Sequence, residues 1–250
     1  VAMLAMIALA IFIIIKNRAK TNKTDDKDDV FDKAMSTNEQ EVIYKSLIQH
    51  NRESINELLN VAKNIYVGVV DAFVKEDIKT LRKASNDCRL AKEKMKQLKR
   101  KEIMIMRRLD DKMMDKNTWF HLSYNCIEQI LYSLRRICDP CKEYVDNSFT
   151  PLDKKYLPEV ENLKEKVVWS VEAADITVYS SEYKDIDAVM ERVKIREDEL
   201  VEMTHGQMNR IQHDKDNIDL ALLYLNIIQE SSEIVTEMRH LLRSEAKLNE

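Results

Sequence analysis

The four cysteines of this 250-residue chain are its clearest candidates for metal or redox chemistry. Cys138 and Cys141 form a Cys-x-x-Cys motif around Pro140, whereas Cys88 and Cys126 stand alone. A zinc site would need a second closely spaced pair, and a redox motif would begin a helix that follows a strand, which this sequence does not predict. We therefore predict reduced cysteines on a helix bent at Pro140, as is usual in a reducing compartment.

Two Glu-x-x-His motifs, Glu202–His205 and Glu237–His240, have the ligand spacing of carboxylate-bridged di-iron bundles. If the helices that carry them turn near residue 215, the two motifs are separated by roughly 12 Å along the helix axis. One metal cluster cannot use both, so we predict ordinary ion pairs on solvated faces. The remaining three histidines have no nucleophile at a meaningful spacing. Neither a catalytic triad nor a glycosidase-type acid pair is present, so the sequence does not predict an enzyme.

A strongly basic stretch covers residues 89–108, with nine Lys and Arg against two Glu. Its candidate contact residues are Lys92, Lys96, Lys99 and Arg100. Such a stripe can bind anionic lipid or an acidic partner. Nucleic acid is not a predicted partner, because no aromatic side chain is interleaved for base stacking. The alternative is that the stretch is simply the solvated face of a long helix.

The elements that position these residues are predicted to be helices. The chain has only two glycines, Gly68 and Gly206, and three prolines, with 34% charged and 6% aromatic residues. Phosphate loops, dinucleotide fingerprints and nucleophile elbows need glycine at tight turns, and so do most β-hairpins. The composition therefore predicts an all-α fold. Both glycines fall inside predicted helices, where glycine is unfavourable, so we expect a close helix contact or a bend at each.

The N-terminal residues 1–15 are continuously apolar and are followed by Lys16, Arg18, Lys20 and Lys23. A secretory signal would carry its positive charge before the apolar run. We therefore predict the C-terminal part of a transmembrane helix, truncated at its start, with the chain after it in the cytoplasm. Residues 16–38 are polar and charged without an apolar period, and they predict a linker.

Apolar positions recur at spacings of three and four from residue 39 onward and predict six long helices. The predicted ranges are about 39–73, 78–113, 117–149, 152–182, 185–213 and 218–247, and the fourth helix is bent or restarted at Pro158. The loops between these helices are short, which predicts antiparallel neighbours and hence one helical bundle, the domain of residues 39–250.

The bundle divides into two similar halves, residues 39–149 and 152–247, with three helices each. A Leu-x-x-Asn-x-Ile pattern recurs in the third helix of both, at Leu122–Ile127 and Leu223–Ile228. Residues 1–158 carry 29 basic against 23 acidic side chains, and residues 159–250 carry 11 against 21. The repeated pattern suggests an internal duplication, and the opposite charges suggest different surfaces or partners.

Two three-helix halves with matching third helices resemble the PhoU fold. PhoU-like proteins carry a Glu/Asp-x-x-x-Asp motif, commonly within Leu-Glu-Arg-Ile-Gly-Asp, on a helix of each half. The run Leu134-Arg135-Arg136-Ile137-Cys138-Asp139 resembles it, but has Arg135 in place of the first carboxylate and Cys138 in place of glycine. The equivalent run in the second half, Ser232–Thr236, lacks both carboxylates.

A metal-binding bundle is one alternative function. In this hypothesis Asp139, Glu143 and Asp146, together with carboxylates of neighbouring helices, hold a divalent or iron ion. No other cofactor is expected.

The whole arrangement, with stretches such as residues 52–71 and 112–146, resembles bacterial inorganic phosphate transporters of the PiT or sodium–phosphate cotransporter type that carry a cytoplasmic extension. This resemblance implies cation-coupled phosphate import by an upstream membrane part in the bacterial inner membrane. The bundle would then be a regulatory or scaffolding domain. Implied partners are the membrane, the upstream transmembrane domain, phosphate as transported substrate, and a regulatory protein or a second copy. A membrane-anchored signalling module is a third hypothesis, but residues 16–38 lack the heptad repeat it would need.

Overall fold

The computed structural model describes residues 37–107, 114–213 and 217–249, and all regular structure in these ranges is helical. The all-α prediction is therefore confirmed. The elements are α2 (Thr37–Val74), α3 (Ile78–Met106), α4 (Met114–Asp146), the short 3-10 helix η2 (Lys154–Tyr156), α5 (Leu157–Ser180), α6 (Ile186–His213) and α7 (Ile218–Asn249). The predicted transmembrane segment and most of the predicted linker lie outside the described residues.

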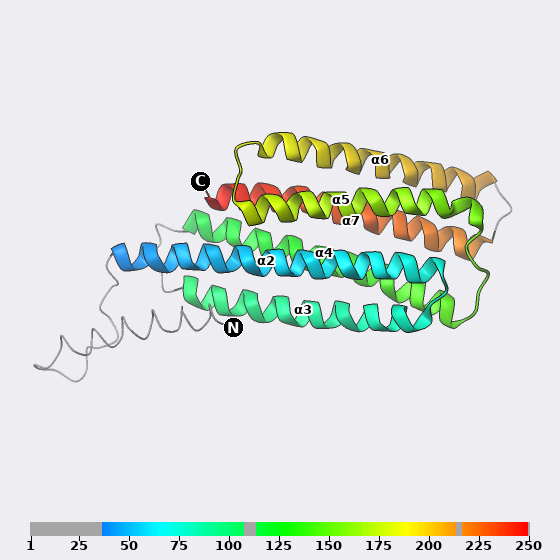
Figure 1. The fold of residues 1–250 in the computed structure, drawn as a ribbon, viewed down its shortest axis with the longest axis horizontal. Coiled ribbons are helices and arrows are strands. Elements are labelled where there is room, and N and C mark those ends of the chain that lie inside the picture. The colour runs from blue at the N-terminus through cyan, green and yellow to red at the C-terminus, as the bar shows by residue number, and fades with distance from the viewer. Residues whose placement is uncertain (1–36, 108–113, 214–216, 250) are drawn as a thin grey trace, which may run out of the picture.

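The six long helices form one elongated bundle in which successive helices run antiparallel (Figure 1). Helix α2 packs on α3, α4 and α5, while α7 packs on α4, α5 and α6. Exchanging α2 with α5, α3 with α6 and α4 with α7 leaves the set of closely packed pairs unchanged. The two halves thus occupy equivalent places, and they meet where α2 contacts α5 and where α4 contacts α7.

Several of the predicted helix boundaries differ from the structure, and the largest differences among the helix starts are those of α4 and α5. Helix α4 begins at Met114, before the predicted start at Asn117. Helix α5 begins at Leu157 after a short 3-10 turn, so the helix predicted from Leu152 restarts at Pro158 instead of bending there. Proline lacks an N–H and suits the first turn of a helix, so α5 starts immediately before Pro158.

The chain turns without glycine by placing other residues in the left-handed backbone region. Glu76, Ser148 and Ser181 have φ values of 54°, 53° and 58°. After α2, the N–H of Asp77 donates to the carbonyl of Ala72 at 2.8 Å, which satisfies a helix-terminal acceptor. These turns explain how a chain with so few glycines still folds into short-looped antiparallel helices.

The expected close helix contact at the two glycines is wrong, whereas the alternative, a bend, stays a prediction. A Cβ atom built at Gly68 or at Gly206 would meet no atom within 4 Å outside its own helix backbone and chain neighbours. Neither glycine therefore marks a close helix contact. Both sit within helices where alanine would fit.

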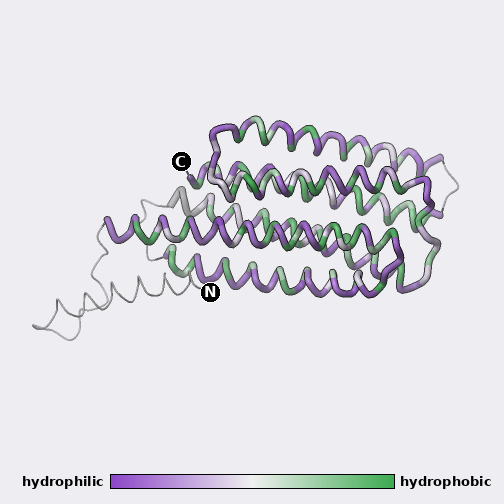
Figure 2. Tube along the Cα trace, viewed as in Figure 1, coloured by the Kyte–Doolittle hydropathy of each residue, from purple (hydrophilic) through white to green (hydrophobic). Residues whose placement is uncertain are grey.

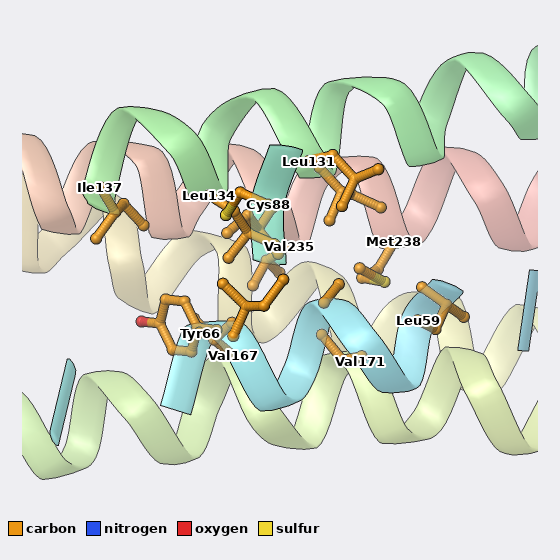
Figure 3. Packing of buried hydrophobic residues seen from close by; sticks show 14 of the residues in the cluster. Leu59, Tyr66, Cys88, Leu131, Leu134, Ile137, Val167, Val171, Val235 and Met238 are labelled. Atoms are coloured by element: carbon orange, nitrogen blue, oxygen red, sulfur yellow. The ribbon is translucent and has the colours of Figure 1, made fainter. Parts of the chain in front are cut away.

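The core is continuous and receives apolar side chains from all six α-helices. Figure 2 shows the apolar positions as stripes along the helices. Figure 3 shows Leu59 and Tyr66 of α2, Leu134 of α4, Val167 of α5 and Val235 of α7 meeting in the interior, and each is at most 1% exposed. Full burial of such a side chain stabilises the fold by about 1.5–3 kcal/mol, so this shared core joins the two halves.

Pro140 lies inside α4 and interrupts its hydrogen bonding. Proline has no N–H, so the carbonyl of Arg136, one turn earlier, loses its helical donor. Asn226 of α7 replaces it, because its side-chain Nδ2 donates to the Arg136 carbonyl at 3.0 Å. The interruption in α4 is thus compensated by the helix that packs against it.

Candidate functional site

A group of buried polar side chains lies toward the end of the bundle where α2 begins and where α3 and α7 terminate, the Thr37 end (Figure 1). Glu102 precedes the last residue of α3 by four positions, and Glu245 precedes the last residue of α7 by four. We call this group the buried acid cluster. Its members are at most 4% exposed and are Asn51, Ser54, Glu102, Ser123, Tyr124 and Glu245.

The helix periodicity puts these polar groups inside. Asn51 lies four residues after Leu47 and four before Ile55 on the buried stripe of α2. Glu102 lies seven residues after Met95 on the stripe of α3. A side chain at such a position must face the core while the helix stays straight. Polar residues that interrupt an apolar stripe are therefore the sequence signal for this site, which no metal or catalytic motif marks.

The contacts within the cluster are few. The Asn51 Nδ2 donates to Glu245 Oε1 at 3.2 Å. His50 Nε2 lies 3.5 Å from Glu102 Oε1. Both oxygens of Glu102, Glu245 Oε2, Asn51 Oδ1 and the Tyr124 hydroxyl are buried and lack a well-formed hydrogen bond among the described residues. The Tyr124 hydroxyl is nevertheless close enough to Glu102 and Ser54 to interact with both by hydrogen bonding. Four of these five atoms are carboxylate or amide oxygens, so the group they lack is a donor or a positive charge.

Burial dominates the electrostatics of the cluster. It raises the pKa of Glu102 to about 8; Tyr124 opposes this effect, and the charge of Glu245 adds to it. Burial also raises the pKa of Glu245, against hydrogen bonding by Ser123 and Asn51. The pKa of His50 is lowered, again mainly by burial. Neutral forms of both Glu102 and His50 are therefore favoured near neutral pH.

A third buried glutamate, Glu230, is paired with a cation. Glu230 of α7 is 3% exposed, but Arg136 of α4 donates to its Oε1 through Nε at 2.6 Å. The Arg136 guanidinium also lies 5.3 Å from the ring centre of Tyr132. A buried carboxylate at the α4–α7 contact is thus matched by a cation, unlike those of the buried acid cluster.

The structure places the three predicted metal ligands along the outer side of α4. Asp139 lies 3.0 Å from Arg135 Nε and accepts a hydrogen bond from Ser85 Oγ at 2.8 Å. Asp146 pairs with Arg82 at 2.7 Å, and Glu143 is exposed. Across residues 37–107, 114–213 and 217–249, no three His, Cys, Asp or Glu side chains lie where they could hold a metal ion. Two of the three candidate ligands are instead neutralised by arginine.

The predicted basic contact residues divide into two pairs. Lys92 Nζ lies 5.6 Å from the ring centre of Tyr132, and Lys99 Nζ donates to Asn125 Oδ1 at 2.7 Å. These two side chains therefore bind α3 to α4. Lys96 and Arg100 are exposed and face away from the core. Only this second pair presents its charge to solvent, so it is the part of the predicted stripe open to an anionic lipid or partner.

All four cysteines are buried and reduced, as predicted. Cys88 of α3 and Cys138 of α4 nevertheless come together, with 3.5 Å between their sulfur atoms. The spacing of the cysteines along the chain gave no sign of this contact, which requires α3 to pack on α4.

The two Glu-x-x-His motifs do not come together to hold a metal ion within the part of the chain that the structure describes. Glu202 and His205 are exposed. His240 Nδ1 lies 3.5 Å from Glu237 Oε1, within its own motif.

None of the helices in the described ranges combines the length and apolar character needed to cross a bilayer. The predicted transmembrane residues 1–15 fall outside those ranges. No family model and no curated protein matches the chain. The case for a function therefore rests on the residues and their geometry.

Proposed function

We propose that the chain is the C-terminal part of an inorganic phosphate transporter for cation-coupled phosphate import, and that its bundle is a PhoU-like regulatory or scaffolding domain. The observation that supports this proposal best is the equivalence of the two halves. Helices α2, α3 and α4 pack with one another and across the middle in the pattern that α5, α6 and α7 repeat. A duplicated three-helix unit is the architecture that the PhoU resemblance implies.

The local geometry at Asp139 fits a regulatory role better than a metal-binding one. Arg135 stands where the family motif has its first carboxylate, and it forms an ion pair with Asp139. Lys142 Nζ lies 3.9 Å from the same carboxylate. A site with two cations and one carboxylate repels a metal ion, so the bundle would act through its contacts and not through a bound cluster.

In this proposal the bundle changes the balance between states of the membrane part. A domain can do so only if it contacts those states with different free energies. The chain enters the bundle at the Thr37 end, so movements of α2 and of the helix ends beside it are the ones that reach the linker. Lys96 and Arg100, both exposed on α3, are available to contact anionic lipid.

The coding sequence upstream of Val1 provides the first test. Several further apolar spans are expected there, because a permease needs many membrane helices. A single apolar segment would contradict the transporter and favour a membrane-anchored signalling protein.

Phosphate uptake provides the second test. Cells with the full-length protein, or with a version that lacks residues 39–250, would be compared by uptake of radiolabelled phosphate at low and high external phosphate. We expect a changed rate or loss of regulation with the shortened protein still inserted. Leu134→Asp, which disrupts the core, should reproduce the deletion, whereas Ile176→Asp, at a position 67% exposed, should not. Uptake that is indistinguishable in rate and regulation would overturn the proposal.

A further inference from the structure

Glu102 is a carboxylate with no adequate charge partner. It is fully buried, and neither of its oxygens has a well-formed hydrogen bond among the described residues. Its one hydrogen-bonding neighbour is the hydroxyl of Tyr124, which is neutral. An ionised carboxylate in that position would cost several kcal/mol unless a cation or several donors compensated it. Either a neighbouring cation or a bound proton must therefore compensate the charge.

The charged and polar neighbours of Glu102 come from each of the three helices packed around it. Helix α2 provides His50, whose Nε2 is 3.5 Å away, and α4 provides the neutral Tyr124. Helix α7 provides Glu245, a second acid, on which the positive charge of Arg52 of α2 acts. The remaining charged groups near His50 are Glu53 and Lys101, and Lys101 is an exposed neighbour of Glu102 in sequence.

His50 does not serve as the missing cation. Its ring is largely buried, which favours the neutral imidazole, and the nearby Lys101 charge acts in the same direction. A neutral imidazole has one nitrogen that accepts a hydrogen bond. A protonated Glu102 could donate its O–H to that nitrogen, or to the neighbouring Tyr124 hydroxyl. One proton would thus give Glu102 a donor and remove its repulsion with Glu245.

A metal ion is a poorer explanation than a proton. The described residues, which include His50, Glu102 and Glu245, contain no group of three His, Cys, Asp or Glu side chains arranged to hold one. A proton needs no such arrangement, only a carboxylate oxygen and an acceptor nearby.

We propose that the buried acid cluster is a proton-binding site, in which Glu102 carries the proton and keeps the last turn of α3 packed against α2 and α4. Loss of the proton breaks the O–H bond of Glu102, passes the proton to water or hydroxide, and leaves the electron pair on the buried carboxylate. The uncompensated charge then draws water to the Thr37 end and loosens residues 98–106. Any effect on transport rests on the proposed function, but the proton site itself does not.

The direction of the pH response follows from linkage. The folded chain holds the Glu102 proton up to about pH 8, whereas an unfolded glutamate releases it near its ordinary pKa of 4.5. The stabilisation is therefore complete below pH 4.5 and is lost as the pH rises toward 8. One bound proton changes the folding equilibrium by up to about tenfold per pH unit in this window.

The test compares the purified 250-residue chain with Glu102→Gln, which keeps the shape of the side chain without a titrating group. Glu143→Gln, at an exposed position of α4, is the matched control. Thermal unfolding would be followed from pH 5 to pH 9, together with hydrogen exchange of residues 98–106 corrected for the intrinsic pH dependence. We expect the wild type and the control to lose stability and protection as pH rises, and Glu102→Gln to lose less of both.

Equal pH profiles for wild type and Glu102→Gln would overturn the proposal, and so would a profile that only Glu245→Gln flattens, since the proton would then sit on Glu245. If Glu102→Gln does not fold, infrared spectroscopy of the wild-type chain decides. A protonated-carboxyl C=O band at pH 7 that disappears toward pH 9 supports the site, and its absence at pH 7 contradicts it. None of these measurements depends on phosphate transport, so failure of the proposed function would leave them unaffected.

Discussion

Helices α3 and α6 occupy equivalent places in the two halves but are held there by different forces. Helix α3 buries seven residues, six of them apolar or cysteine, whereas α6 buries only Val193, Leu200 and Gln207. Both helices are close to the same length, with 29 and 28 residues. Similar topology therefore does not imply similar anchoring, and α6 has much less buried apolar surface to oppose its release.

Polar contacts compensate for part of this difference in α6. Glu199 lies 2.6 Å from Lys166 Nζ of α5, and Arg210 forms an ion pair with Glu159 at 2.6 Å. The Arg192 guanidinium lies 4.9 Å from the ring of Trp169. Contacts of this kind are partly exposed and individually weak. Helix α6 is accordingly the element that we expect to open first, because local stability follows buried apolar contacts.

The largest expected effect comes from removing one buried leucine from each helix. Leu81 of α3 and Leu200 of α6 are both fully buried, and Leu→Ala at such a position costs about 3 kcal/mol. Leu81→Ala should lower the melting temperature of the whole bundle. Leu200→Ala should mainly release α6, so hydrogen exchange of residues 186–213 should accelerate by about 100-fold while α4 stays protected. Equal acceleration in all helices would show that α6 opens only when the whole bundle unfolds, as α3 does.

Replacement of the two glycines is the next largest effect. Alanine fits at both positions, and it favours a helix over glycine by about 1 kcal/mol. Gly206→Ala should slow hydrogen exchange within α6 specifically. Gly68→Ala, in the well-anchored α2, should instead raise the melting temperature of the whole bundle by a few degrees. A loss of stability in either variant would mean that the glycine has a contact partner after all.

The glycines also show the limit of inference from the sequence. Composition predicted the all-α class, because a chain so poor in glycine and proline cannot form tight strand connections. The apolar period predicted the six long helices to within a few residues at most ends. However, a glycine within a helix does not reveal which neighbour it faces. That depends on the rotation of each helix against the others, and neither Gly68 nor Gly206 faces one closely.

The candidate site could not be predicted from the sequence for the same reason. Asn51, Glu102 and Glu245 lie on three different helices, and each alone is one polar residue within an apolar stripe. Their convergence depends on the axial alignment of α2, α3 and α7. The predicted ligand Asp139 was misleading in the opposite way, since its spacing suggested a metal but its neighbours Arg135 and Ser85 already satisfy it.

A smaller effect distinguishes α3 from α6, because a change of pH destabilises the two helices in opposite directions. Hydrogen bonding from Lys166 lowers the pKa of Glu199. Its stabilisation of α6 is therefore present above the ordinary glutamate pKa and is lost as the pH falls through the lowered value. Acid should loosen α6, whereas alkali should loosen the end of α3. Glu199→Gln should cost α6 about 0.5 kcal/mol at pH 7, because the pair is partly exposed and screened.

Hydrogen exchange of residues 186–213 at pH 7 and at pH 3.5, in low and high salt, measures this effect. The wild type should lose protection in α6 on acidification or addition of salt, and Glu199→Gln should respond less to both. Exposed Glu202, in the same helix, provides the control variant Glu202→Gln. If the control behaves like Glu199→Gln, the Lys166 contact does not anchor α6.

A stabilising effect of the same size concerns the two equivalent turns that lead into α3 and α6. Glu76 and Ser181 both have a left-handed backbone, which glycine adopts without the steric cost of a Cβ atom. Glu76→Gly and Ser181→Gly should each stabilise the turn by about 0.5 kcal/mol, after subtraction of the greater freedom of glycine in the unfolded chain. Ser181→Ala keeps the Cβ and should give no gain. If α6 is anchored less firmly than α3, Ser181→Gly slows hydrogen exchange in α6 alone. Glu76→Gly should instead raise the melting temperature of the bundle, because α3 leaves the core only when the core itself unfolds.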